Sequence, residues 1–224
     1  ILPPVENPEH LDDLNEWQRQ AVEQVDGPLL VLAGAGSGKT RVITYRIAHI
    51  IATGAAKPDR ILAVTFTNKA AGEMKSRVID LLGPQGRWVW LSTFHSFCAR
   101  ILREHSEPLG FKRSFSIYDE AESQALVKMI YKNKGIPDSQ PSVGIARTRI
   151  SRAKDRLIGP ETYAETASDF LEVNVSTVYN EYQKRLFKNQ AMDFDDLLMK
   201  TVQLFDQFPQ ILKIYHDRFK YILI

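Results

Sequence analysis

The sequence has 224 residues with 44% hydrophobic and 25% charged side chains, a balance that excludes a disordered chain, and no apolar run approaches the roughly twenty residues of a membrane span. Its formal net charge of +2 neither indicates nor excludes a nucleic-acid partner, because binding depends on where the charges lie. The single cysteine, Cys98, cannot form an intrachain disulfide and no signal sequence opens the chain, so we expect a cytoplasmic protein without a membrane partner.

The first predicted elements are a helix, a buried strand, a second helix and a second strand. Asn15 is the predicted cap of the first helix. The short apolar run Leu29–Ala33 is typical of a strand buried on both faces of a parallel sheet. Helical spacing of apolar residues begins at Lys39 and stops before Gly54, and Ile61–Thr65 is another short apolar run. This order predicts a strand–helix–strand unit with parallel strands.

The pattern repeats once before the sequence becomes helical. The repeat predicts a helix capped by Asn68 that runs to Leu82, a strand over Trp88–Leu91 and a helix over Phe94–His105. The helices predicted next, with no convincing strand between them, are Glu120–Lys134, Val143–Arg156, Pro160–Phe170 and Val175–Lys188. The elements predicted last are the helices Asp193–Phe205 and Pro209–Phe219 and the strand Tyr221–Ile224.

A glycine-rich loop joins the first predicted strand to the second predicted helix. Residues 34–40 read Gly-Ala-Gly-Ser-Gly-Lys-Thr, and Ala33 stands where the strict consensus has its first glycine. Glycines let backbone N–H groups turn inward, and the start of the helix adds its positive end, so the loop can cradle phosphates. The residues expected to bind the nucleotide are Ala35, Gly36, Ser37, Gly38, Lys39 and Thr40. Lys39 would reach the outer phosphates and Thr40 would bind Mg²⁺, which makes these two the expected catalytic residues.

The segment Leu-Asn-Glu-Trp-Gln ahead of this loop resembles the glutamine motif of UvrD/Rep/PcrA-type superfamily 1 DNA helicases. In that family the glutamine reads adenine, and an amide suits the task because it can pair with both a donor and an acceptor. The resemblance implies that Gln18 selects ATP and that Arg41 stacks on the base. It extends over essentially the whole chain, which corresponds to about a third of a full helicase.

The resemblance and the order of the elements together predict the fold. Residues 1–117 and 193–224 are expected to form a P-loop NTPase (RecA-like) core with a parallel sheet, incomplete at its carboxyl end. Residues 118–192 are expected to form an inserted all-helical subdomain.

Two further segments follow predicted strands and resemble the single-strand-DNA motifs of this family. In Thr-Phe-Thr-Asn-Lys-Ala-Ala, Phe66 would stack on a base while Thr67 and Asn68 would donate to a phosphate. In Thr-Phe-His-Ser-Phe, Thr93 and His95 are the expected DNA contacts. The alternatives are a core phenylalanine beside an asparagine cap and a core imidazole.

Two clusters of charge remain open to two interpretations each. One is basic and consists of Arg147, Arg149, Arg152, Lys154 and Arg156. Helical spacing places Arg149, Arg152 and Arg156 near one face, which would be either a footprint for duplex phosphates or a solvated helix face. The other is acidic and consists of Asp193, Asp195 and Asp196, for which a helix cap is favoured over a metal site.

The resemblance implies an ATP- and Mg²⁺-dependent helicase or translocase that acts on single-stranded DNA and single-strand/duplex junctions with 3′–5′ polarity. The acidic pair that holds Mg²⁺ and activates water would follow the strand ending at Ile224, so this chain is expected to bind nucleotide weakly and not to hydrolyse it. Three alternatives stay open: the helicase subunit of a RecB/AddA-like nuclease, a P-loop ATPase that does not act on nucleic acid, and a non-catalytic nucleic-acid-binding module.

Overall fold

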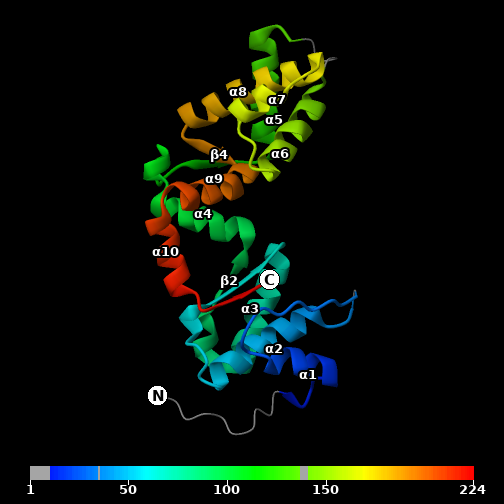
Figure 1. The fold of residues 1–224 in the computed structure, drawn as a ribbon, viewed down its shortest axis with the longest axis vertical. Coiled ribbons are helices and arrows are strands. Elements are labelled where there is room, and N and C mark those ends of the chain that lie inside the picture. The colour runs from blue at the N-terminus through cyan, green and yellow to red at the C-terminus, as the bar shows by residue number, and fades with distance from the viewer. Residues whose placement is uncertain (1–10, 35, 137–140) are drawn as a thin grey trace. The chain divides into compact units, whose positions relative to one another are not determined.

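A computed structural model describes residues 11–34, 36–136 and 141–224 (Figure 1). The chain forms two compact units, Ile1–Phe97 with Lys213–Ile224 and Cys98–Leu212, which we call the sheet unit and the helical unit. The expected limits of an inserted subdomain, 118–192, lie inside the helical unit and stay a prediction. Within the described ranges no helix is both long and apolar enough to cross a membrane.

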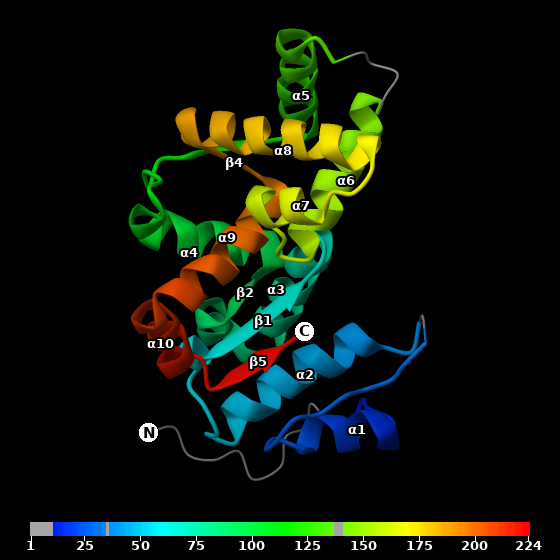
Figure 2. The same ribbon diagram turned by 45° about the horizontal axis from the view of Figure 1, so that its top comes forward.

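The sheet unit contains a parallel three-stranded sheet in the order β2-β1-β5, with β1 at Ile61–Thr65, β2 at Trp90–Thr93 and β5 at Tyr221–Leu223 (Figure 2). The register pairs Thr65 with Thr93, so the carboxyl ends of β1 and β2 lie at the same edge of the sheet. The strand predicted at Ile61–Thr65 is confirmed, and the next strand lies two residues further along the chain than predicted.

Apolar residues from two helices cover one face of this sheet. They are α2 (Lys39–Ala52) and α3 (Asn68–Leu82), which bury Ile47, Ile50, Met74 and Val78 in one cluster with Ile61 and Ala63. Alternation along β1 turns Leu62 and Val64 to the opposite face. Trp90, the register partner of Leu62, packs there against Phe97 and Phe219 at centroid distances of 5.4 and 5.5 Å.

Shorter helices also belong to the sheet unit. They are α1 (Glu16–Glu23) and the 3-10 helices η2 (Pro58–Arg60) and η3 (Gly83–Trp88). Asn15 caps α1 as predicted, with its side chain accepting from the backbone N–H of Gln18 at 2.9 Å. The cap of α3 is Thr67 and not the predicted Asn68, because Thr67 is the residue with extended backbone and its hydroxyl accepts from the backbone N–H of Ala70.

The strand predicted at Leu29–Ala33 is wrong. These residues are not in a strand, and the side chains of Leu30 and Leu32 are 82% and 88% exposed. A parallel strand needs a neighbour that supplies its hydrogen bonds, and among the described residues β5 pairs with β1 alone. A cavity of about 760 Å³, lined by Leu29, Leu30 and Val31 as well as by Tyr221 and Ile222, lies where a ladder would have to form. An apolar run indicates that a segment can be buried, but it does not show whether a neighbouring strand is present to pair with that segment.

The helical unit begins within α4 (Phe94–His105) and ends within α10 (Pro209–Arg218). Its other helices are η4 (Glu107–Leu109), α5 (Glu120–Lys134), α6 (Val143–Asp155), α7 (Pro160–Thr166), α8 (Phe170–Lys188) and α9 (Phe194–Gln207). Its core joins α5, α6 and α8 through buried residues that include Ile130, Tyr131, Ile150, Val178 and Tyr179. The helix predictions are confirmed to within two residues at each end, except that α7 ends four residues earlier and α8 begins five residues earlier than predicted.

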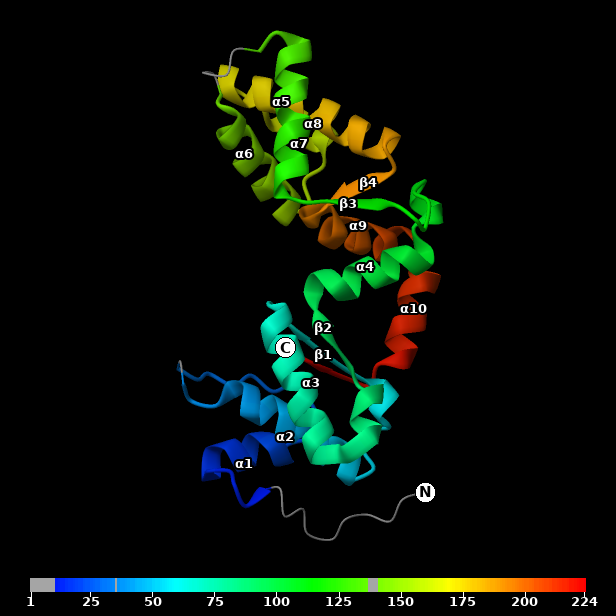
Figure 3. The same cartoon turned by 180° about the vertical axis from the view of Figure 1, so that it is seen from behind.

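Two short strands in the helical unit were not predicted. β3 (Ser116–Tyr118) and β4 (Ala191–Asp193) pair in parallel, on either side of the helices α5 to α8 in the chain (Figure 3). Three residues are too few to show an alternating pattern, which is why the sequence between the helices gave no convincing strand.

Candidate nucleotide and nucleic-acid site

The glycine-rich loop runs directly into α2 and has the backbone shape that its sequence predicts. Gly36 and Gly38 have φ angles of 77° and 87°, in the left-handed region that favours glycine. Gly38 is the residue before α2, and no side chain caps the helix. The first N–H groups of α2 are therefore left to an incoming anion. Ala35 lies outside the described residues.

The ammonium group of Lys39 is held against the loop. Its Nζ donates to the carbonyl oxygens of Ala33 at 3.0 Å and Gly34 at 2.7 Å, and the hydroxyl of Ser37 also donates to Gly34 at 2.7 Å. Thr40 lies half-buried in the first turn of the same helix. Backbone donors, one ammonium and one hydroxyl are a donor set that fits a triphosphate with Mg²⁺.

Gln18 contacts this loop from α1. Its Oε1 accepts from the backbone N–H of Asn15 at 3.2 Å, and its Nε2 donates to the carbonyl oxygen of Ser37 at 3.0 Å. A Cβ atom on Gly38 would lie 2.8 Å from the same Nε2, so a larger residue there would displace the Gln18 amide as well as strain the backbone. Both ends of the amide bind protein groups, and the reading of adenine by Gln18 stays a prediction.

Arg41 lies in the first turn of α2, next to an acid and an aromatic ring. Its Nη2 lies 3.7 Å from Oδ2 of Asp13, and its guanidinium lies over the ring of Tyr45, 5.4 Å from the centroid. The predicted stacking of Arg41 on a base is not tested by these contacts.

The two predicted DNA motifs lie side by side at the carboxyl edge of the sheet. Phe66, directly after β1, is 80% exposed, so the alternative of a core phenylalanine is wrong. Thr67 and Asn68 are exposed at the start of α3, and His95 is half-buried at the start of α4. Thr93 is buried, and its hydroxyl donates to Oγ of Ser96 at 2.9 Å and accepts from the backbone N–H of Ser96 at 3.1 Å. Its contact with DNA stays a prediction.

The basic cluster does not form one surface. Lys154 is buried, with Nζ 2.6 Å from Oδ2 of Asp193 and 3.0 Å from Oδ1 of Asp196. Arg147 pairs with Glu120 at 2.8 Å and Arg149 with Glu172 at 3.5 Å. Of the three arginines of the predicted footprint, Arg149 is already paired with an acid, and Arg152 and Arg156 are exposed, so the footprint stays a prediction. The burial of Lys154 could have been predicted from the sequence, because Lys154 falls at helical spacing on the same stripe as Ala146 and Ile150.

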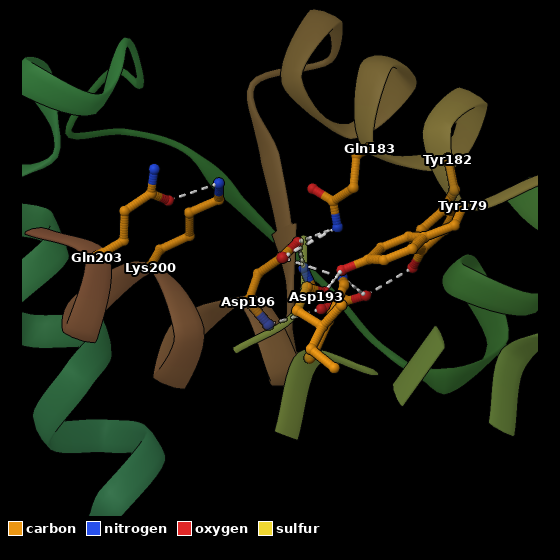
Figure 4. Close-up of polar contacts among 9 residues, drawn as sticks. Tyr179, Tyr182, Gln183, Asp193, Asp196, Lys200 and Gln203 are labelled. Carbon is orange, nitrogen blue, oxygen red and sulfur yellow. Dashed lines mark hydrogen bonds and ion pairs between the residues drawn. The ribbon is translucent and has the colours of Figure 1, made fainter. Parts of the chain in front are cut away.

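Two members of the acidic cluster, Asp193 and Asp196, form a helix cap and lie side by side in Figure 4. The same two carboxylates bind Lys154. Asp193 caps α9 and Asp196 completes a capping box with it. Tyr182 donates to Asp193 at 2.9 Å and Gln183 donates to Asp196 at 3.1 Å. Burial raises the pKa of Asp196; at Asp193 burial acts the same way, but Lys154 overcomes it and holds the pKa below its usual range. The predicted cap is confirmed, and the described residues contain no group of acids, histidines or cysteines that could hold a metal ion.

Comparison with known proteins shows the family of this chain. The family model described as UvrD/REP helicase N-terminal domain matches residues 14–224. The chain is 48% identical to the ATP-dependent DNA helicase PcrA of Bacillus subtilis (strain 168) over 212 residues, which are 95% of this chain and 29% of that protein. It is 44% identical to the PcrA of Staphylococcus epidermidis over 210 residues, and 43% identical to that of Staphylococcus aureus (strain Mu50) over 212 residues, again 29% of each. The chain therefore spans less than a third of these relatives, and it belongs to the UvrD/REP helicase N-terminal domain family.

Proposed function

We propose that this chain is the ATP- and single-strand-DNA-binding part of an ATP-dependent DNA helicase or translocase. The observation that carries the proposal is the parallel register of β1 and β2, which places the Phe66 and His95 motifs at one edge of the sheet. The relatives that are named ATP-dependent DNA helicases support it.

The phosphate loop would bind the triphosphate of ATP. The N–H groups at the start of α2 would bind phosphate oxygens. The ammonium of Lys39 would bind them too, and it would give up its hydrogen bonds to the carbonyls of Ala33 and Gly34 to do so. Thr40 would be the protein ligand of Mg²⁺, which would supply positive charge against the phosphates. Gln18 and Arg41 would bind the adenine base, which requires the amide of Gln18 to exchange a protein partner for the base.

The carboxyl edge of the sheet would bind the DNA strand. Phe66 would stack on a base, and Thr67, Asn68, Thr93 and His95 would contact the backbone. Stacking tolerates any base, as a motor that moves along a strand requires. A 3′–5′ direction and action at single-strand/duplex junctions follow from the family resemblance and are part of the proposal.

Single-strand-DNA binding tests this proposal directly. In fluorescence anisotropy with a labelled oligothymidylate, Phe66→Ala is expected to weaken binding about tenfold, because one stacked base is lost. His95→Ala is expected to weaken binding about threefold and to reduce its salt dependence if the imidazole binds a phosphate. The matched control is Trp88→Ala, which removes an exposed ring ahead of β2, at the opposite end of that strand. No binding would favour a P-loop ATPase that does not act on nucleic acid, whereas binding indifferent to both changes would mean that the strand does not bind at this edge of the sheet.

Nucleotide turnover by this chain is expected to be absent even where nucleotide binds. The reaction needs a carboxylate that activates water, and none of the residues proposed here for the nucleotide site is an acid. Phosphate release and the binding of a fluorescent ATP analogue should be measured on the same sample. Steady-state phosphate release that disappears in Lys39→Ala would contradict this expectation, since it would require another acid in the chain to activate water.

A further inference from the structure

Two aromatic rings stand next to each other at the carboxyl edge of the sheet, one from each proposed DNA motif. The ring centroids of Phe66 and Phe94 are 5.3 Å apart and the rings are tilted by 46°. Phe66 is 80% exposed, whereas Phe94 is half-buried. The pair therefore consists of one ring that is available to a ligand and one that is anchored in the fold.

The backbone that carries each ring is fixed on both sides. Thr65 and Thr93, the residues directly before the two rings, are paired in the parallel register of β1 and β2. Directly after Phe66, the hydroxyl of Thr67 accepts from the backbone N–H three residues further on, at 3.1 Å, and the hydroxyl of Thr93 accepts in the same way just before Phe94. With both backbones fixed, the orientation of the exposed ring depends on its side-chain torsions and on the ring beside it.

We propose that Phe94 is a positioning residue, whose ring restricts Phe66 to an orientation in which it can stack on a base of single-stranded DNA; this rests on the proposed function. An exposed phenylalanine loses rotamer freedom when a ligand stacks on it, and that loss weakens binding. A ring that already packs against a fixed neighbour has less freedom to lose. Phe94 thus acts through Phe66 and needs no contact of its own with DNA.

A double-mutant cycle separates this role from a merely structural one. In binding to a labelled oligothymidylate, Phe66→Ala is expected to cost about tenfold in affinity, and Phe94→Ala about threefold. The double variant is expected to bind no more weakly than Phe66→Ala, because Phe94 has nothing left to position. Phe94→Tyr keeps the ring and is expected to bind like the wild type. Phe94→Leu keeps apolar volume without the ring and is expected to bind like Phe94→Ala.

A spectroscopic measurement reports the stacking itself. A 2-aminopurine base in the oligonucleotide loses fluorescence when an aromatic ring stacks on it, so at saturating protein Phe94→Ala and Phe94→Leu are expected to quench it less than the wild type does. Thermal unfolding of each variant shows whether the fold is kept, and Phe94→Leu serves where the alanine variant unfolds. Trp88→Ala is expected to leave affinity and quenching unchanged.

The outcomes separate this inference from the proposed function. Suppose that the wild type binds DNA and that Phe66→Ala weakens binding. Unchanged affinity and quenching in Phe94→Ala and Phe94→Leu then overturns the positioning role. A double variant that loses the product of the two single effects also overturns it, because Phe94 then acts independently of Phe66. If Phe66→Ala binds like the wild type, the inference falls while DNA binding stands. If the wild type binds no DNA, both fall.

Discussion

Replacing Lys154 by alanine is expected to lower the free energy of unfolding of the helical unit by about 3 kcal/mol at pH 7. The ammonium of Lys154 is fully buried and lies 2.6 Å from Asp193 and 3.0 Å from Asp196. Its removal leaves two buried carboxylates without their ion-pair partner. The hydrogen bonds from Tyr182 and Gln183 remain, but neutral donors do not replace a full charge.

This loss is expected to shrink as the pH falls. In the wild type Lys154 holds the pKa of Asp193 below its usual range, so Asp193 contributes stability above its unfolded-state pKa and loses it as the pH falls through the folded value. Without Lys154, burial governs both carboxyls and raises their pKa, so the folded variant takes up protons more readily than the unfolded chain. The difference in unfolding free energy is therefore largest near neutral pH and narrows toward about pH 4.

The three tryptophans of the chain, Trp17, Trp88 and Trp90, all lie in the sheet unit, which allows the two units to be followed separately. In urea titrations, Lys154→Ala should lower the midpoint of the circular dichroism transition more than that of tryptophan fluorescence. Equal shifts in both signals would mean that the two units unfold together, and no shift in either would contradict a stabilising role for Lys154.

Two control variants identify the cause of the effect. Arg152→Ala changes an exposed residue of the same helix and is expected to stay within about 0.5 kcal/mol of the wild type. Combining Lys154→Met with Asp193→Asn and Asp196→Asn removes all three charges while asparagine still caps α9. This triple variant is expected to regain more than half of the lost stability, because no buried charge is left unpaired.

Much of the sheet unit could be predicted because its signals are local. The apolar run of β1, the helical spacing that begins at Lys39 and the caps near Asn15 and Asn68 each depend on a few neighbouring residues. The position of the two proposed DNA motifs at one edge then follows from parallel pairing alone. The contact of Phe66 with Phe94 is a direct consequence of that register.

The features that escaped prediction depend on partners that are distant in the sequence. Leu29–Ala33 has the composition of a strand, but among the described residues no strand pairs with it. The partner of Lys154 lies 39 residues away, and no local pattern joins the two. A charged residue on the apolar stripe of a helix nevertheless requires a buried counter-charge, so the acidic start of α9 was a candidate that sequence alone could have matched to it.

Replacing Lys39 by alanine is expected to weaken the binding of a fluorescent ATP analogue by more than about tenfold, because charged hydrogen bonds to phosphate oxygens are lost. The ammonium now donates to the carbonyls of Ala33 and Gly34, so the variant also removes two hydrogen bonds that organise the loop. Because the ammonium would exchange these two hydrogen bonds for phosphate contacts when ATP binds, the loss of the phosphate contacts decides the expected change in affinity. Titration of analogue fluorescence with Mg²⁺ present measures the change.

Further variants separate the contributions of charge, loop structure and metal. Lys69→Ala removes an exposed lysine of α3 and is expected to leave affinity unchanged, which controls for net charge. Thr40→Ala keeps the ammonium and is expected to abolish the gain in affinity that Mg²⁺ gives, because the hydroxyl is the proposed metal ligand. If Lys39→Ala binds as well as Lys69→Ala does, the loop is not the phosphate site. If Thr40→Ala keeps the full response to Mg²⁺, the metal binds through phosphate oxygens and water without this hydroxyl.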